Sequence, residues 1–195
     1  GTIATQANYI YNGAVAQVTG NRLPATVYTL SIDNSAGGND GVVLTNAVNV
    51  TYRLNLNQGL LKLGNNNLRL MNNDNSTALG GNAPSANNMV VIDGTGALFK
   101  QYTNAASSYT PFTFPLGEIT GTREYSPVEL TFSYVNTTGM VGAQVIDGVH
   151  PNMAPATGYL SRYWDFTTTN FTTYTYAANF TYQSADPVST YNAGL

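Results

Sequence analysis

The sequence predicts an all-β protein in which stacked short strands continue into a β-sandwich of the jelly-roll or immunoglobulin-like kind. Short apolar alternations recur between breaks rich in Asn and Gly, which is the pattern of short strands joined by tight corners. The composition favours strands and turns over helices, with 26 Thr, 24 Asn, 19 Gly and 14 Tyr. Longer alternations with many aromatic residues follow in the second half.

The clearest short alternations lie between Tyr28 and Met71. They occupy residues 28–32, 42–44, 48–52, 54–56, 60–63 and 68–70. A strand presents alternate side chains to opposite faces, so Leu54 and Leu56 share one face. The breaks between the runs are too short for helical crossovers of about a dozen residues. The segment is therefore a stack, either a β-solenoid-like coil of parallel rungs or an antiparallel meander.

Turn signals assign the neighbouring elements. Asn12-Gly13 stands between apolar residues and predicts a hairpin in the first segment. Pro24 precedes the strand at 27–32, where a missing amide donor costs least. Residues 89–100 read as a second hairpin, and residues 110–115 and 127–134 as further strands.

The second half has the aromatic alternation expected of a sandwich. Its aromatic residues are Tyr159, Tyr163, Trp164, Phe166, Phe171, Tyr174, Tyr176, Phe180 and Tyr182. Two packed sheets need large inward side chains to fill the roughly 10 Å between them. We expect Trp164 to be a core residue. Residues 72–88 have almost no apolar content and predict a surface loop, which would divide a short-strand part (1–75) from a sandwich-like part (76–195) unless the two form one continuous domain.

Charge and cysteine content exclude several classes of protein. The chain has 17 charged residues, a net charge of −3 and a pI near 4.8, so it lacks the basic field that a nucleic-acid binder needs. The absence of cysteine excludes a disulfide framework and a Cys-type zinc site. No run is long enough to span a membrane, and Gly1 begins without a signal peptide, as expected of a mature or excised piece.

Many short motifs in a consistent order resemble the repeat modules of large adhesin-like surface proteins from gliding, type IX-secreting bacteria. The motifs lie at residues 11–13, 28–34, 54–63, 90–98, 114–117, 125–130, 148–151 and 159–164. The resemblance covers nearly the whole chain. It implies an extracellular, all-β building block of a bacterial cell surface, one of many in a long filamentous or adhesive protein.

The sequence stops soon after the strand at 174–182, where modules of this kind continue with further sandwich strands. A sandwich cut there would leave a sheet edge open, and open edges recruit strands from other chains. We therefore expect the partners to be copies of this chain or adjacent modules of the same polypeptide. Addition of a strand from a neighbour would build a fibre.

Catalysis is the first alternative. His150 is the only histidine and could join Ser161 and an aspartate in a relay, but no Gly-x-Ser-x-Gly elbow accompanies it. Glu118, Glu124 and Glu129 could serve glycoside hydrolysis. Turn and strand positions explain these residues equally well, so the sequence favours a protein that is not an enzyme.

Calcium is the only cofactor that the sequence suggests. Asp33, Asp40 and Asp74 lie in turns beside Asn residues, and Ca²⁺ takes carboxylate, amide and carbonyl oxygens. The same residues also occupy turns because their side chains bond their own backbone. No EF-hand spacing is present, and these three aspartates are weak candidates.

Carbohydrate binding is the second alternative. Tyr and Trp rings stack on sugar faces, and Asn side chains supply paired hydrogen bonds, so surface glycans are possible partners. The function that the sequence favours remains a non-catalytic extracellular module for structure or cell adhesion, a repeat unit or subunit of a surface fibre assembled through strand edges.

Overall fold

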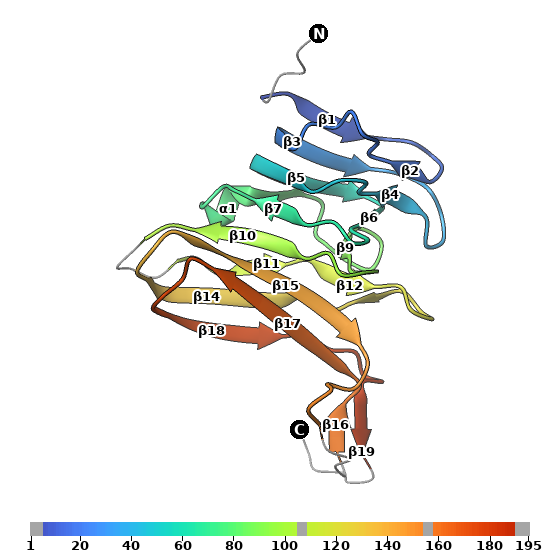
Figure 1. Cartoon of the computed structure of the whole chain (residues 1–195). Helices are drawn as coiled ribbons and strands as arrows, with labels where there is room; N and C mark the ends of the chain where they lie inside the picture. The colour runs from blue at the N-terminus through green and yellow to red at the C-terminus, as the bar shows by residue number, and fades with distance from the viewer. Residues whose placement is uncertain (1–5, 105–108, 154–157, 190–195) are drawn as a thin grey trace.

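The computed structural model describes residues 6–104, 109–153 and 158–189, and in it the strands form a stack that runs from β1 to the β17 and β18 layer (Figure 1). Apart from one four-residue helix, α1 (Asn75–Ala78), the regular elements in these ranges are strands. No described helix is long and apolar enough to cross a membrane.

The largest sheet runs the length of the stack in the order β1-β3-β5-β7-β10-β15-β17, with β8 beside β5. Its strands are β1 (Asn8–Tyr11), β3 (Thr26–Asp33), β5 (Val48–Gln58), β7 (Leu68–Leu70), β8 (Leu79–Gly81), β10 (Leu98–Tyr102), β15 (Gly139–Asp147) and β17 (Arg162–Thr169). Pairing is parallel from β1 to β10 and antiparallel from β10 to β17.

A second sheet follows the same axis in the order β2-β4-β6-β9-β12-β13. Its strands are β2 (Gln17–Val18), β4 (Gly41–Val43), β6 (Leu60–Lys62), β9 (Val90–Val91), β12 (Leu116–Glu118) and β13 (Glu124–Tyr125). The pairs are parallel except the last, β12 with β13.

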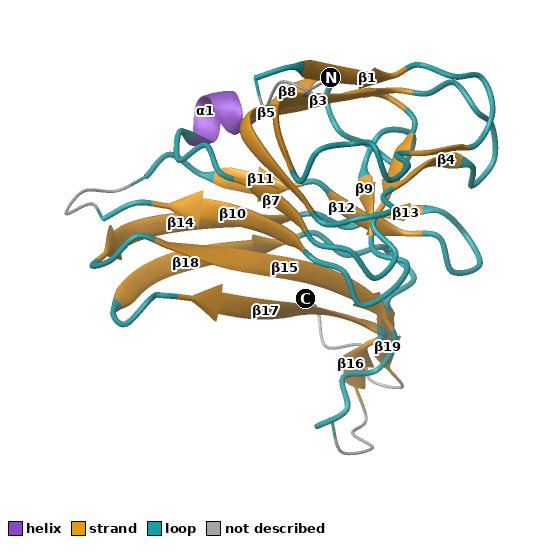
Figure 2. Cartoon of the chain, turned by 45° about the horizontal axis from the view of Figure 1, so that its top comes forward, coloured by secondary structure: helices purple, strands orange, loops and turns teal. Residues whose placement is uncertain are grey.

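Two smaller antiparallel sheets complete the molecule. One has the order β11-β14-β18, formed by β11 (Phe112–Phe114), β14 (Val128–Val135) and β18 (Tyr174–Phe180). The other pairs β16 (Gly158–Leu160) with β19 (Pro187–Ser189). Figure 2 shows β14 and β18 lying beside β10, β15 and β17 at the end of the stack away from β1.

The stack is β-solenoid-like, which decides between the two arrangements that the sequence left open. From β1 to β7, consecutive strands alternate between the two long sheets, and each pairs with the strand one rung away. The hairpin predicted at Asn12-Gly13 is therefore wrong, because β1 pairs with β3 and β2 pairs with β4. The hairpin predicted at 89–100 is wrong for the same reason, because β9 and β10 lie in different sheets.

The segment 72–88 forms part of a rung of the coil and contains the short helix α1 and the strand β8. Asp74 caps α1 by accepting a hydrogen bond from the amide of Ser76 at 2.9 Å, and β8 then pairs with the second half of β5. Asn75, Ala78 and Asn88 are buried. Polar composition predicted a surface loop here, but asparagine amides in this segment bond backbone carbonyls of neighbouring rungs, which satisfies them inside the stack.

Leucines facing inward from successive rungs build the core. Leu54, Leu56, Leu61, Leu63 and Leu68 are each almost completely buried, as their alternation predicts. One contiguous cluster of buried apolar residues extends from Leu23 to Val145, through both halves of the chain. The division near 72–88 remains a prediction that this continuity does not by itself decide.

Asparagine side chains tie one rung to the next. Asn34 donates to the carbonyl of Val15 at 2.9 Å, and Asn66 donates to the carbonyl of Leu44 at 2.8 Å. These residues stand at corners, where strand hydrogen bonds end and backbone groups need other partners. Asparagine at these corners thus satisfies backbone groups that the strands leave unpaired.

Candidate functional site

The first rung leaves strand edges open at one end of the stack. Among the described residues, β1 pairs only with β3, and β2 pairs only with β4. Large apolar side chains are exposed here: Ile10 at 61%, Val15 at 70% and Val18 at 61% of their surface. The first rung therefore presents both unpaired backbone groups and apolar surface.

The opposite end of the stack has open edges too. Within the described ranges, β17 pairs only with β15, and β18 pairs only with β14. All seven residues of β18 are exposed, with Tyr176 at 54% and Phe180 at 42%. We call the surface formed by β17 and β18 the aromatic end.

Aromatic rings fill the space between β17 and β18 without being covered on the outside. The ring of Trp164 lies 5.0 Å from that of Phe180, and the ring of Phe166 lies 6.2 Å from it, centroid to centroid. Trp164 also donates from Nε1 to the carbonyl of Ser126 at 3.1 Å. It is half-buried and packs against the core, consistent with the expected core position.

Neither β1 nor β18 carries the features that normally protect an edge strand. Their sequences, Asn-Tyr-Ile-Tyr and Tyr-Thr-Tyr-Ala-Ala-Asn-Phe, contain no charged residue and no proline. Charged side chains and proline are the usual means of preventing edge pairing. These two edges are chemically suited to accept another strand.

Beside the aromatic end, one buried arginine gathers three carboxylates. Arg162, at the start of β17, is 2% exposed and bonds Asp186 from Nε at 2.8 Å. It also pairs with Glu124, and its Nη1 lies 3.7 Å from Oε1 of Glu118. Burial raises the pKa of Glu118 above its usual range, against the hydrogen bonds and the Arg162 charge, which lower it.

The arginine cluster joins segments that are distant in the sequence. Asp186 precedes β19, Glu118 ends β12 and Glu124 begins β13. Gln183 adds a bond from its side chain to the carbonyl of Tyr125 at 2.7 Å. The cluster thus fixes the segment after β18 against the second long sheet.

Of the candidate catalytic residues, the structure brings together only Glu118 and Glu124. Glu118 and Glu124 both face Arg162, whereas Glu129 accepts a hydrogen bond from Thr113 on the neighbouring strand. His150 packs edge-on against the ring of Tyr163 at 4.9 Å, and its Nδ1 accepts from the amide of Asn152. Ser161, its suggested partner, donates instead to the carbonyl of Asp186.

Lys100 is a second buried charge that the sequence analysis missed. It is fully buried in β10, donates to the carbonyl of Gln101 at 2.8 Å and lies 4.9 Å from the ring centre of Tyr102. Burial lowers its pKa to about 7, and the charge of Asp74 opposes this shift. Lys100 alternates with Leu98 and Tyr102, which both face inward, and this alternation was the signal for its burial that the sequence offered.

The three calcium candidates lie at separate positions. Asp33 ends β3, Asp40 lies in the corner before β4, and Asp74 caps α1. Asp74 already accepts two hydrogen bonds from Ser76, which lower its pKa. In the described part of the chain, no cluster of three His, Cys, Asp or Glu side chains is placed to hold a metal. Calcium binding stays a prediction.

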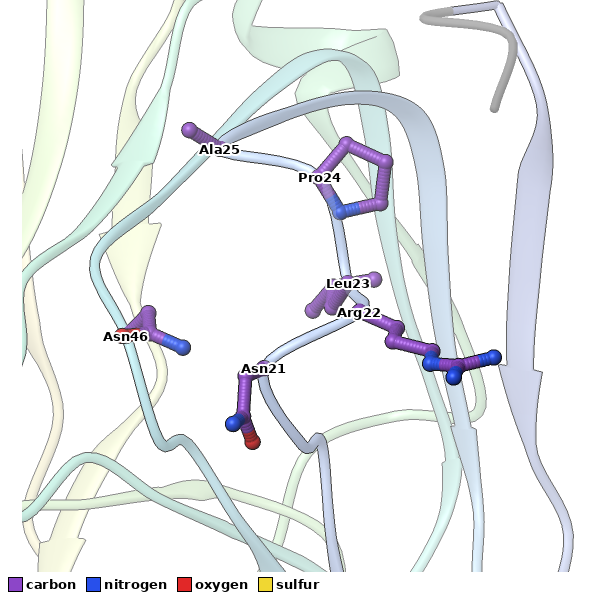
Figure 3. Close-up of a pocket in the computed structure, with 6 residues that line it drawn as sticks. All are labelled: Asn21, Arg22, Leu23, Pro24, Ala25 and Asn46. Atoms are coloured by element: carbon purple, nitrogen blue, oxygen red, sulfur yellow. The ribbon is translucent and has the colours of Figure 1, made fainter. Parts of the chain in front are cut away.

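Two surface hollows lie at corners of the coil. The larger, about 640 Å³, is formed by the loop between β2 and β3 together with Asn46 (Figure 3). Its lining residues are Asn21, Arg22, Leu23, Pro24, Ala25 and Asn46. The second, about 360 Å³, lies between the corner before β4 and Arg123. No aromatic ring lines either hollow, so neither offers a stacking surface for a sugar.

Tyr28 of β3 and Tyr52 of β5 form a stacked aromatic pair on the largest sheet. Their rings stack with centroids 4.7 Å apart and planes 7° from parallel, and the Arg53 guanidinium lies 5.3 Å from the Tyr52 ring centre. A sugar platform needs rings side by side in one plane. In this pair, one face of each ring is covered by the other ring.

No family model, curated protein or solved structure matches this chain in comparisons with known proteins. The resemblance to bacterial adhesin modules is therefore an expectation from the motifs alone.

Proposed function

We propose that this chain is a non-catalytic structural module of an extracellular surface fibre or adhesive array, joined to copies of itself or to adjacent modules through strand edges. The observation that carries the proposal is the presence of open edges without charge or proline at both ends of one stack. Contacts between opposite ends of a stack translate each copy along the stack axis, and such head-to-tail contacts propagate into a filament when the rotation between copies does not close a ring.

The aromatic end supports the same proposal. We interpret β10, β15 and β17 with β11, β14 and β18 as two layers of an incomplete sandwich, because rings from both layers meet between them, Trp164 with Phe180 and Tyr102 with Phe132. Side chains such as Tyr176 are exposed, and no further strand of the described residues covers them. A strand from a neighbour would remove this apolar surface from water.

Composition supports a location outside the cell. The chain has many Thr, Asn and Tyr residues and few charges, which is more typical of surface β-proteins than of cytosolic enzymes. The adhesin-like motifs support a bacterial cell surface. Cell adhesion would then use the exposed corners and loops.

The test is self-assembly of the purified chain. We expect the sedimentation coefficient to increase with protein concentration, and we expect electron microscopy to show filaments. Ala177→Lys places a charge on the exposed side of β18 and should abolish assembly, because an edge lysine opposes strand addition. Asn39→Lys, in an exposed corner, carries the same charge and should assemble normally. A chain that stays monomeric at high concentration contradicts the proposal.

A further inference from the structure

The two open ends run in compatible directions. The arrows of β1 and β18 point the same way in Figure 1, whereas β17 points the opposite way. A copy placed above the aromatic end in the same orientation would therefore lay its β1 parallel to β18. Parallel pairing is the mode already used from β1 to β10.

The inward faces of β1 and β18 are also alike. Tyr9 and Tyr11 of β1 pack against the core, with Asn8 and Ile10 between them facing outward. On β18, Tyr176 and Phe180 contact rings of the core. Because side chains alternate, parallel addition of β1 to β18 would set tyrosines against these rings and continue the core from one copy into the next.

The charges of the two ends differ in sign. Residues 6–25 contain a single charged residue, Arg22, which is exposed. Residues 163–183 also contain a single one, Asp165, likewise exposed. A head-to-tail contact therefore joins ends of opposite charge, whereas a two-fold contact between identical ends joins ends of the same charge.

We infer that the occupant of the aromatic end is the first rung of a second copy, with β1 of one copy adding in parallel to β18 of the other. This inference rests on the proposed function and assigns the polarity of the fibre. Every copy points the same way along the fibre axis. Such a contact is heterologous, so the fibre keeps one open β1 at one tip and one open β18 at the other.

Cysteine cross-linking tests the polarity, because the chain has no cysteine of its own. Ile10→Cys is mixed with Thr175→Cys, Ala177→Cys or Asn179→Cys, all of which face outward on exposed positions. Paired residues on neighbouring strands are about 4.8 Å apart, within the range that a disulfide bridges. We expect one β18 position to give a mixed dimer that exceeds both homodimers about tenfold, matching a preference of roughly 1.4 kcal/mol.

Controls and contrary outcomes separate this inference from the proposed function. Asn39→Cys mixed with Ile10→Cys should give no such excess, and circular dichroism should confirm that every variant is folded. Homodimers of the β18 variants in place of mixed dimers overturn the polarity. Absence of cross-linking from all three positions also overturns it. If sedimentation still shows assembly in either case, the proposed function survives; if every sample is monomeric, both fail.

Discussion

Two cationic side chains occupy inward positions on strands where apolar residues are expected. Lys100 has no carboxylate within ion-pair distance among the described residues, and Arg162 has three carboxylates around it. Burial of an unpaired charge is unfavourable, whereas a paired one depends on its partners remaining in place. The two sites therefore lead to opposite expectations when the charge is removed.

Replacement of Lys100 by Met should stabilise the fold. The pKa of Lys100 falls from 10.5 to about 7 in the folded chain, so the unfolded state binds more protons between these values. The free energy of unfolding should consequently rise from pH 7 to pH 9 by about 2 kcal/mol, since one pH unit across such a shift is worth about 1.4 kcal/mol. Lys100→Met should be more stable at pH 7 and lack this rise, as measured by urea unfolding.

The Lys100 comparison is restricted to pH 9 and below because burial raises the pKa of Tyr125 to about 12. Ionisation of that tyrosine would act in the opposite direction at higher pH. Lys62→Met, at a half-buried lysine paired with Asp93, serves as the matched control and should keep the rise. An identical pH dependence in wild type and Lys100→Met would contradict the prediction.

Replacement of Arg162 by Met should destabilise the fold by about 3–5 kcal/mol, because it leaves buried carboxylates without their cation. Urea unfolding at pH 7 measures this loss. The loss should shrink at pH 4, where protonation neutralises carboxylates, and Glu118 should protonate first because its pKa is raised. Arg22→Met, at an exposed arginine, should change stability by less than about 0.5 kcal/mol. A loss of equal size at both pH values would show that packing, and not charge, is responsible.

At the scale of the elements, the corners of the coil determine which strands pair. Gly59 joins β5 to β6 with φ of 85°, and a Cβ there would lie 2.2 Å from the carbonyl oxygen of Asn34 in the preceding rung. The corner thus needs both a left-handed backbone and a close approach between rungs, which only glycine allows.

Gly59→Ala should destabilise the chain more than Gly38→Ala. Gly38 also has positive φ, at 61°, but nothing lies within 4 Å of its added Cβ, so only backbone strain of about 1 kcal/mol is expected. Gly59→Ala adds the clash with the Asn34 backbone. Its total cost should be at least about 2 kcal/mol, which lies within the range for a residue held in a strained backbone conformation. Thermal unfolding of both variants measures the difference; equal losses would mean that the rungs can separate at this corner without cost.

The sequence identified the strands of the coil but not their partners. The alternation of leucines at 54–56, 61–63 and 68–70 placed each side chain on its correct face, because alternation depends only on local geometry. Asn12-Gly13 was misread because the same turn residues serve hairpins and coil corners. Partner choice depends on contacts between rungs, which no local pattern contains.

The candidate site was predicted in outline only. The aromatic alternation of β18 was visible, and its exposure follows from the absence of a further paired strand among the described residues. The cluster around Arg162 was not predictable, since it unites residues from 118 to 186 through tertiary packing. Glu118 and Glu124 were noticed as acids, but their common partner was not.

For the whole molecule, the continuous core predicts cooperative unfolding. The buried cluster crosses the segment 72–88 and joins Leu23 to Val145. We expect fluorescence of Trp164, near the aromatic end, and circular dichroism of the whole chain to give the same urea midpoint. Two separate midpoints would favour the division into parts 1–75 and 76–195.

Because successive rungs pair in parallel register, the chain can gain or lose a whole rung at a time. Leu30 pairs with Leu54, and Leu68 pairs with Leu98, so successive rungs use different numbers of residues while presenting the same faces to their neighbours. Loss or duplication of one rung preserves the contacts above and below it, whereas loss of one residue within a strand turns its leucines outward. Evolution can therefore lengthen this protein by whole turns of the coil, and insertions such as α1 are confined to the corners.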